Sequence, residues 1–288
     1  MKSIFYSAII SFALLSLFSC KEHEDIVNSK DSKKDTNQST FALSDGSTTL
    51  SDVIENYLYE PNLVGVIEFN SLEQHDLTWT ETGGVKTYHE NDFTTNYAYA
   101  GFRYNDDPFT VENLLINASL LREYADGAYS KTGPDELDLY FNGSTPNKYY
   151  IECLDNSYIP DTVKSQVIFS NGIQITNVQR YDTLSRSSEQ GFQVNWVGGA
   201  PSGKIAIHIG LNDYFEANEN ESSGMYELSE NDGTHTFQTS QMEMLGPVNT
   251  YYDVEVECYE PIFHTLDNGN KICLVGVSRY RTTVYLKE

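Results

Sequence analysis

Residues 251–277 read YYDVEVECYEPIFHTLDNGNKICLVGV. Two runs rich in β-branched and aromatic residues, 251–259 and 271–277, have the composition and short period that indicate strands. Between them lies Asp267-Asn268-Gly269, and Asn and Gly tolerate the positive φ angles that tight hairpin turns require. The stretch therefore predicts a long antiparallel hairpin and places the chain in the β class.

The same pattern recurs along most of the chain, divided by turn signals such as Asn231-Asp232-Gly233. Helical spacing is confined to residues 48–61, where Thr49 or Ser51 would cap a short helix that ends before Pro61. Many short strands with regular turns favour an all-β fold built from β-sandwiches. The other expected strands are 63–69, 96–104, 113–121, 135–141, 148–154, 165–170, 192–197, 204–211, 234–239 and 282–286.

The length and the change in pattern along the chain suggest four segments. Residues 1–19 have the layout of a signal peptide, and residues 20–40 are almost without apolar residues, which is typical of a flexible tether. The rest is expected to form two tandem β-sandwich domains, at 41–178 and 179–288. The second has the size and strand count of an immunoglobulin-like domain, with Trp196 as its expected buried tryptophan. The strand topology of the first is left open.

Three cysteines follow Cys20: Cys153, Cys258 and Cys273. Cys258 and Cys273 flank the predicted hairpin and are the only natural disulfide pair. If the hairpin turn is tight, however, Cys258 lies opposite residues near Arg279 and misses Cys273. We therefore expect free, buried thiols, although a disulfide remains open. The cysteines show no CxxC or Cys/His spacing, so we expect no zinc site.

The N-terminus carries its own signal. The run from Ile4 to Phe18 has no charged residue and is too short to span a membrane. It ends in Leu17-Phe18-Ser19-Cys20, which resembles the lipobox of bacterial lipoproteins, and the acidic cluster 21–25 behind it resembles the surface-export signal of outer-membrane lipoproteins. The resemblance implies that Cys20 is lipidated and that the protein is anchored in the outer membrane, facing the cell exterior. The alternative is an ordinary secretory signal.

The formal net charge of −24 argues against one class of partner. Nucleic-acid binding depends on Lys and Arg residues that neutralise phosphates, so we expect no nucleic-acid partner. Residues 198–204, GGAPSGK, match the core of a phosphate-binding loop. That loop needs Ser or Thr next and a helix behind it, whereas Ile205 follows and 204–211 reads as a strand. We interpret the match as a turn and expect no nucleotide.

Catalytic and metal-binding signatures are missing from the sequence. The six histidines, His23, His75, His89, His208, His235 and His264, show no HExxH or similar spacing, and no GxSxG motif occurs. We therefore predict no catalytic residue, no metal ligand and no cofactor. The clusters Asn105-Asp106-Asp107 and Asn218-Glu219-Asn220-Glu221 offer oxygen atoms that a structural calcium ion could use. Solvated acidic turns are the plainer interpretation.

Aromatic residues suggest a binding surface. In NYAYAGFRY (96–104), strand alternation places Ala98, Ala100, Phe102 and Tyr104 on one face, and Tyr97, Tyr99 and Arg103 on the other. The first face resembles a core. The second, which Trp79 would join, would offer flat rings beside an arginine to sugar rings or a peptide. Structural packing of these tyrosines is the alternative.

Taken together, the chain resembles accessory surface lipoproteins that accompany nutrient-uptake systems, many of which bind glycans. The resemblance implies a non-catalytic, lipid-anchored protein that captures an extracellular ligand such as a polysaccharide or a peptide. A second hypothesis is a fimbrial or adhesin-type subunit, which would donate a strand such as residues 282–288. A third is a secreted hydrolase with an accessory domain.

Overall fold

A computed structural model describes residues 62–288, except 106, 132–136, 155, 161 and 213–223; the side chains of 76–79 and 86 are also left out of the description. The described chain is almost entirely strands, with one short helix, α3 (Thr239–Met242). The all-β class is therefore confirmed. The signal segment, Cys20, the tether and the expected helix at 48–61 lie outside the described residues. No helix among the described residues is long and apolar enough to cross a membrane.

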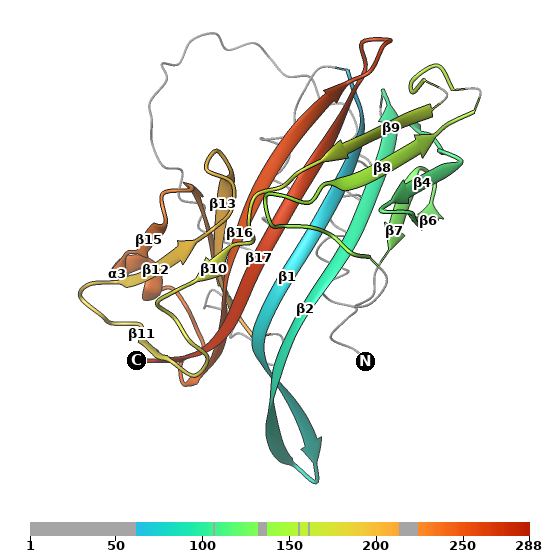
Figure 1. Ribbon diagram of the computed structural model, residues 1–288. Helices are drawn as coiled ribbons and strands as arrows, with labels where there is room; N and C mark the ends of the chain where they lie inside the picture. The colour runs from blue at the N-terminus through green and yellow to red at the C-terminus, as the bar shows by residue number, and fades with distance from the viewer. Residues whose placement is uncertain (1–61, 106, 132–136, 155, 161, 213–223) are drawn as a thin grey trace, which may run out of the picture.

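A large curved sheet forms the body of the molecule (Figure 1). Its strands run in the order β14-β13-β16-β17-β1-β2-β7-β6. At its centre β1 is parallel to β17, and the other neighbours along this path are antiparallel. The bounds are β1 Leu63–Thr82, β2 Val85–Tyr104, β6 Arg122–Ala125, β7 Ala128–Lys131, β13 Lys204–Leu211, β14 Gly224–Glu230, β16 Thr250–Thr265 and β17 Lys271–Lys287. Two short strands, β3 (Asp107–Pro108) and β11 (Thr183–Ser185), pair with β2 and β17.

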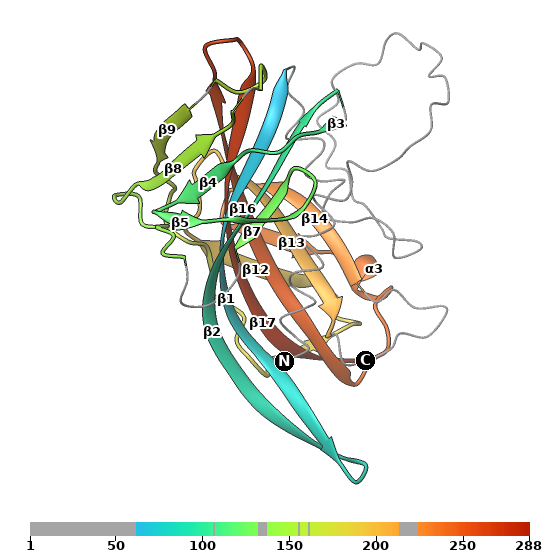
Figure 2. The same cartoon turned by 90° about the vertical axis from the view of Figure 1, so that its right-hand side faces the viewer.

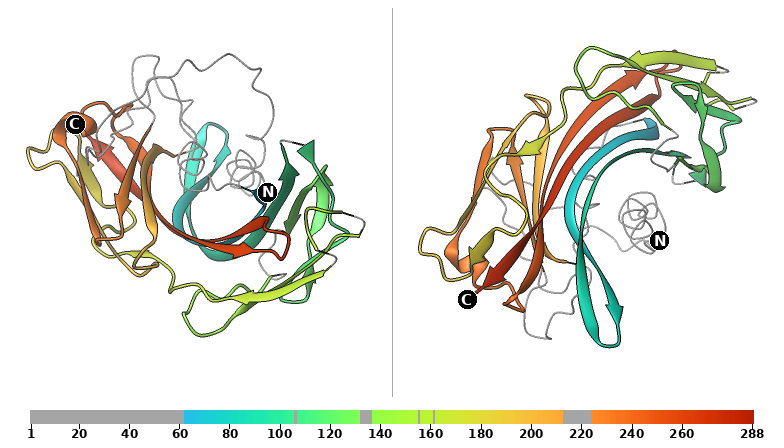
Figure 3. Two further views of the ribbon diagram at one scale, coloured as in Figure 1. Left: turned by 90° about the horizontal axis from the view of Figure 1, so that it is seen from above. Right: turned by 60° about the horizontal axis from the view of Figure 1, so that its bottom comes forward.

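Two small sheets cover the convex face of the large sheet (Figures 2 and 3). One has the order β10-β12-β15 and the other β5-β4-β8-β9. Their bounds are β4 Asn113–Ile116, β5 Ser119–Leu120, β8 Asn147–Glu152, β9 Thr162–Val167, β10 Gln174–Ile175, β12 Phe192–Val197 and β15 Thr234–Phe237. Each small sheet encloses a separate hydrophobic core against the large one.

The long hairpin β16–β17 contributes to both cores. Ile272 and Leu274, near its turn, belong with Leu266 to the first core, whose other members lie within residues 64–169. Tyr252 and Val284, at its other end, belong to the second core, which contains Trp196. The boundary expected at 178/179 falls between β10 and β11, but the large sheet runs across it, because β1 pairs with β17 from Leu63↔Lys271 to His75↔Thr282. The two expected units therefore share a sheet.

A glycine allows the first core to close. Gly276 lies opposite Phe69 in the β1–β17 pairing. A Cβ atom at Gly276 would lie 2.4 Å from Cδ1 of Phe169, so only glycine leaves room for that ring on the sheet. Phe169 then packs on Phe69 with ring centroids 5.2 Å apart, and both side chains are buried. This contact joins the segment after β9 to the large sheet.

Several expected strands differ from the observed ones. The two expected at 271–277 and 282–286 are one strand, because Arg279 and Arg281 stay inside the sheet opposite Glu257 and Glu255. Residues 113–121 are broken by a tight turn at Asn117 and Ala118, which have φ angles of 48° and 65°. Residues 137–141 are not a strand, and β9 ends at Val167 rather than at 170.

The three described cysteines are free and buried, as expected. Cys258 lies opposite Ser278 and Cys273 lies opposite Phe263, so the two sulfurs occupy different faces of the hairpin. Burial raises the pKa of the Cys153 and Cys258 thiols to about 11, which keeps both protonated at neutral pH. The register set by the tight turn therefore keeps Cys258 and Cys273 on opposite faces of the hairpin.

The GGAPSGK stretch is a turn between β12 and β13. Gly198 and Gly199 have φ angles of 87° and 69°, and a Cβ atom on Gly198 would lie 2.1 Å from the carbonyl oxygen of Gly172. The strand β13 follows directly instead of a helix, so the loop lacks the helix N-terminus that a phosphate-binding loop uses. The interpretation of this stretch as a turn is confirmed.

Candidate functional site

The aromatic residues singled out from the sequence lie mostly on the concave face of the large sheet. Alternation along β2 is as expected for Ala98, Ala100 and Phe102, which belong to the first core, whereas Tyr104, expected on the same face, lies at the end of the strand and is 37% exposed. Tyr97 and Tyr99 are on the opposite face, with ring centroids 5.5 Å apart. They are 5% and 4% exposed, so they are packed rather than presented to solvent.

The other two predicted ligand residues lie away from this pair. Arg103 is half-buried near the end of β2, where it pairs with Pro108 of β3. Trp79 lies in β1 opposite Tyr88 of β2, in the part of the hairpin beyond the last β1–β17 pair, and its side chain is outside the described residues. The structure therefore does not assemble Tyr97, Tyr99, Arg103 and Trp79 into one exposed surface.

The concave face instead carries a cluster of charged side chains, which we name the concave charge cluster: Glu68, Glu255, Glu257, Arg279 and Arg281. Nε of Arg279 lies 3.1 Å from Oε1 of Glu257. On the next rung, Nη2 of Arg281 lies 2.6 Å from Oε2 of Glu255. The Tyr259 hydroxyl donates a hydrogen bond to Glu257, and the Asn70 amide donates one of 3.4 Å to Glu68. The cluster thus spans three neighbouring strands.

Burial shifts the ionisation of these groups. It raises the pKa of Glu68 to about 7, although the charge of Arg279 and the hydrogen bond from Asn70 act the other way. Burial also raises the pKa of Glu257, in spite of Arg279 and with a further contribution from Glu255. The pKa of Glu255 is lowered, because Arg281 and Arg279 together outweigh its burial. His208 is half-buried opposite Glu255, and desolvation lowers its pKa to about 4, so the imidazole is neutral at neutral pH.

Displaced pKa values such as these occur both at active sites and in structural ion-pair networks. Glu68, Glu255, Glu257 and Arg279 are each at most 5% exposed, and two of the three carboxylates already hold an arginine. A ligand has no access to such atoms. We therefore interpret the cluster as a structural network that fixes the register of β16, β17 and β1 rather than as the binding site.

The elevated pKa of Glu68 leads to a pH-dependent prediction. Between pH 4.5 and 7 the folded protein binds a proton at Glu68 that the unfolded chain has released, so this group's contribution to stability falls as the pH rises. Glu68→Gln cannot ionise at this position, so the variant does not show this decrease in stability with rising pH. Because one pKa unit corresponds to about 1.4 kcal/mol, the stability of the variant relative to wild type should rise by roughly 3 kcal/mol from pH 4.5 to 8.

Urea unfolding of both proteins across this pH range measures the difference directly. The comparison between variant and wild type is needed because His208 contributes a slope of the opposite sign below pH 6.5. A difference that stays constant with pH would show that Glu68 is ionised in the folded protein.

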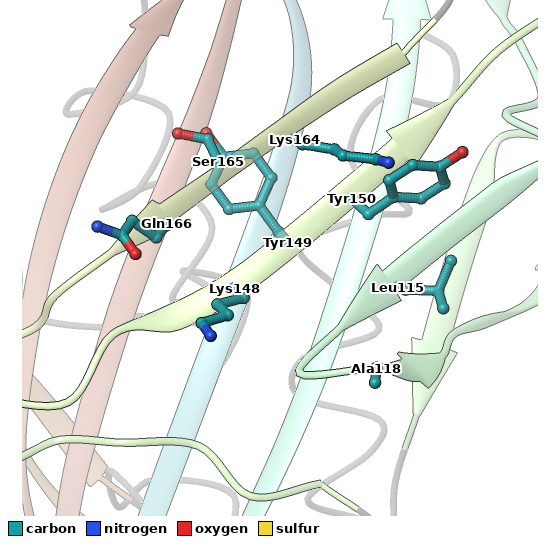
Figure 4. Close-up of a pocket in the computed structure, with 8 residues that line it drawn as sticks. All are labelled: Leu115, Ala118, Lys148, Tyr149, Tyr150, Lys164, Ser165 and Gln166. Atoms are coloured by element: carbon teal, nitrogen blue, oxygen red, sulfur yellow. The ribbon is translucent and has the colours of Figure 1, made fainter.

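A second surface is open to solvent. It lies on the outer face of the small sheet β5-β4-β8-β9, away from the large sheet (Figure 4). There the side chains form a shallow hollow of about 500 Å³. We name its outward-facing part the outer platform. It consists of Leu115, Ala118, Lys148, Tyr150, Lys164 and Gln166.

Strand register determines how the outer platform is arranged. Tyr150 of β8 lies between Leu115 of β4 and Lys164 of β9. Two residues before Tyr150, on the same face of β8, Lys148 lies opposite Gln166. Alternation sends the neighbours Tyr149 and Ile151 inward, where both are buried in the first core. One face of β8 therefore packs in the first core, while the other carries Tyr150 and Lys148 on the solvent side.

The ring of Tyr150 is the centre of the outer platform. The Nζ atom of Lys164 lies 4.8 Å from the ring centroid, in the range of a cation–π contact, and Figure 4 shows the lysine reaching toward the ring. The ring's hydroxyl interacts with Glu152 and Thr162 at the end of the same sheet. These contacts hold a flat aromatic surface beside a positive charge.

The sequence contained part of this signal. The run 148–154, KYYIECL, alternates between two faces of a strand. One face carries Lys148, Tyr150 and Glu152, and the other carries Tyr149, Ile151 and Cys153. Which face the core would cover, and which residues of β4 and β9 would lie beside Tyr150, depended on strand pairing that the sequence does not state. The outer platform was therefore not predicted.

The calcium and metal expectations remain predictions. Asp106 of the first acidic cluster and all four residues of the second, at 218–221, lie outside the described part of the chain. Within that part, no group of three or more His, Cys, Asp or Glu residues is placed to hold a metal ion.

Neither the family models nor the curated proteins searched contain a match to this chain.

Proposed function

We propose that this chain is a non-catalytic, lipid-anchored cell-surface protein that captures an extracellular glycan. The proposal combines two parts of the chain. The lipobox-like segment ending in Cys20 and the acidic cluster at 21–25 would anchor the protein on the outer face of the outer membrane. The tether at 20–40, with a mean reach of roughly 25 Å, would hold the folded part away from the membrane.

The observation that carries the binding proposal is the Tyr150 ring on an open strand face with Lys164 beside it. Sugar rings have an apolar C–H face that packs on a flat aromatic side chain, while their hydroxyl groups accept hydrogen bonds from ammonium and amide groups. Lys148 and Gln166 supply such donors next to the ring. The hollow is shallow and lies across three strands, which suits a polymer better than an enclosed small molecule.

The two other hypotheses receive less support. A fimbrial subunit that donates residues 282–288 would need that segment to be free, whereas 282–286 lies in β17, paired with β16 on one side and with β1 and then β11 on the other. A hydrolase would need accessible carboxylates, and those of the concave charge cluster are buried.

Surface display tests both parts of the proposal together. Cells of a Gram-negative host would express the wild-type chain, Cys20→Ser or Tyr150→Ala, and would be probed with fluorescent polysaccharides selected on a glycan array. Cys20→Ser should abolish cell-associated fluorescence because the protein leaves the membrane fraction. Tyr150→Ala should stay on the cells and bind roughly five- to tenfold less, which is the loss of about one aromatic contact.

The matched control is Tyr88→Ala. Tyr88 is 40% exposed, whereas Tyr150 is half-buried, and Tyr88 lies near the turn of the β1–β2 hairpin, beside Trp79. It should bind like wild type. Loss of binding in Tyr88→Ala with retention in Tyr150→Ala would move the site to the hairpin, and membrane retention of Cys20→Ser would refute the lipid anchor.

A further inference from the structure

We infer that the ligand of the outer platform is an acidic polysaccharide, whose negative groups bind Lys148 and Lys164. The inference rests on the proposed function and adds the chemical class of the ligand. It starts from charge: the chain has 42 acidic and 18 basic residues, so a negative polymer is repelled by most of its surface. Only a local excess of positive charge would give such a polymer a place to bind.

Lys148 and Lys164 provide that excess. Neither lysine forms an ion pair with a described residue, and both side chains are exposed. Several other cations of the described chain do have carboxylate partners: Lys204 pairs with Glu230, Arg186 with Glu288, and Arg180 with Glu90 and Asp92. On the platform itself the nearby carboxylate, Glu152, accepts a hydrogen bond of 2.6 Å from Asn113 and interacts with Tyr150.

Register places the two lysines on one face of neighbouring strands. Lys148 is opposite Gln166 and Lys164 is opposite Tyr150, so the lysines are diagonal neighbours, a relation that typically separates residues by about 7–8 Å. Figure 4 shows the Lys164 side chain reaching toward Tyr150 and the Lys148 side chain pointing in a different direction, so the two ammonium groups would contact different parts of a bound polymer. The arrangement offers one ammonium group over the Tyr150 ring, 4.8 Å from its centroid, and a second one on the neighbouring strand at Lys148.

This geometry fits a sugar ring that carries its charge at the edge. A pyranose stacked on Tyr150 would direct a ring carboxylate or sulfate toward Lys164, while the next residue of the polymer would approach Lys148. Leu115 and Ala118 form the apolar border on the other side of the ring. Charge-assisted hydrogen bonds from lysine to such oxygens are stronger than those to neutral hydroxyls, so the platform should discriminate against neutral glycans.

The experiment uses the chain without residues 1–19 and with Cys20→Ser, analysed by affinity electrophoresis in gels containing one polysaccharide each. The probes are polygalacturonate for carboxylate, dextran sulfate for sulfate, and neutral dextran, and one further gel contains poly-glutamate as an acidic polypeptide. We expect at least about tenfold tighter binding to one or both acidic polymers than to dextran. Lys148→Ala/Lys164→Ala should weaken that binding about tenfold or more and reduce its salt dependence.

A double variant of equal charge, Lys204→Ala/Lys287→Ala, is the control and should bind like wild type. The response to the two acidic probes distinguishes carboxylate from sulfate recognition. Equal binding to neutral dextran, unaffected by the lysine changes, would overturn the inference and leave the proposed function intact. Binding to poly-glutamate but to no polysaccharide would also overturn it, in favour of an acidic peptide. Binding to no probe in this panel overturns the inference, and binding to no glycan on the array removes the proposed function as well.

Discussion

Arg279→Met is expected to lower the free energy of unfolding by about 3–5 kcal/mol, because it leaves the buried carboxylate of Glu257 without its partner. Arg279 is 4% exposed and Glu257 is 5% exposed, so water cannot replace the lost charge. The Glu68 carboxyl also loses the nearby positive charge that opposes its burial. Urea unfolding of the variant and the wild type at the same pH measures the effect.

Two further variants separate the buried pair from a general loss of arginine. In Arg279→Met/Glu257→Gln the remaining polar group is neutral, so a large part of the stability should return. Arg186→Met breaks the exposed contact with Glu288, where the carboxylate is 69% exposed, and should cost less than about 1 kcal/mol. Equal effects of Arg279→Met and Arg186→Met would show that the concave charge cluster is hydrated in solution.

Phe69→Ala is expected to cost about 3–5 kcal/mol, because it empties a fully buried site in the first core. Phe69 is 0% exposed and packs on Phe169. The large sheet gives this substitution a second consequence. Since β16 and β17 belong to both cores, the second core should lose its structure in the same transition as the first.

Trp196 reports on that coupling. It is 3% exposed in the second core, where its indole donates a 2.8 Å hydrogen bond to Asn231. In a Trp79→Phe background, Trp196 is the sole tryptophan and its fluorescence follows the second core alone. Phe69→Ala should shift the Trp196 transition and the far-ultraviolet circular dichroism transition by the same amount. A Trp196 midpoint that does not move would mean that the two cores unfold independently.

Local patterns predicted the strands whose side chains follow simple burial. The runs 192–197 and 204–211 match β12 and β13, and the hairpin turn at 267–269 separates Cys258 from Cys273 as expected. Such elements alternate between a core and an opposite face, so their sequence carries the pattern by itself. The all-β class followed from many such elements.

Long-range pairing accounts for most of what local patterns missed. Two separate strands were expected at 271–277 and 282–286, with Arg279 and Arg281 between them, but the charges of these arginines are matched by Glu257 and Glu255 on the neighbouring β16, which lets β17 continue to Lys287. Likewise, nothing near Leu63 indicates that β1 would run parallel to β17, more than 200 residues later. Partners so distant in sequence leave no local periodicity.

The candidate site was missed for a related reason. Tyr97 and Tyr99 were placed on the correct face of β2, but whether that face is exposed depends on the whole sheet. The sequence around Tyr150 does not show which cation lies beside its ring, because Lys164 is brought there by the β8–β9 register. Binding surfaces on sheets are built across strands, so one strand shows only a part of them.

The most direct test of the outer platform is hydrogen–deuterium exchange of the chain with and without the acidic polysaccharide that binds it best. Bound polymer should slow exchange in β4, β8 and β9, at 113–116, 147–152 and 162–167, and should leave the β1–β2 hairpin unchanged. Protection centred on residues 76–91, or on the concave strands β16 and β17 with β4, β8 and β9 unaffected, would contradict the account.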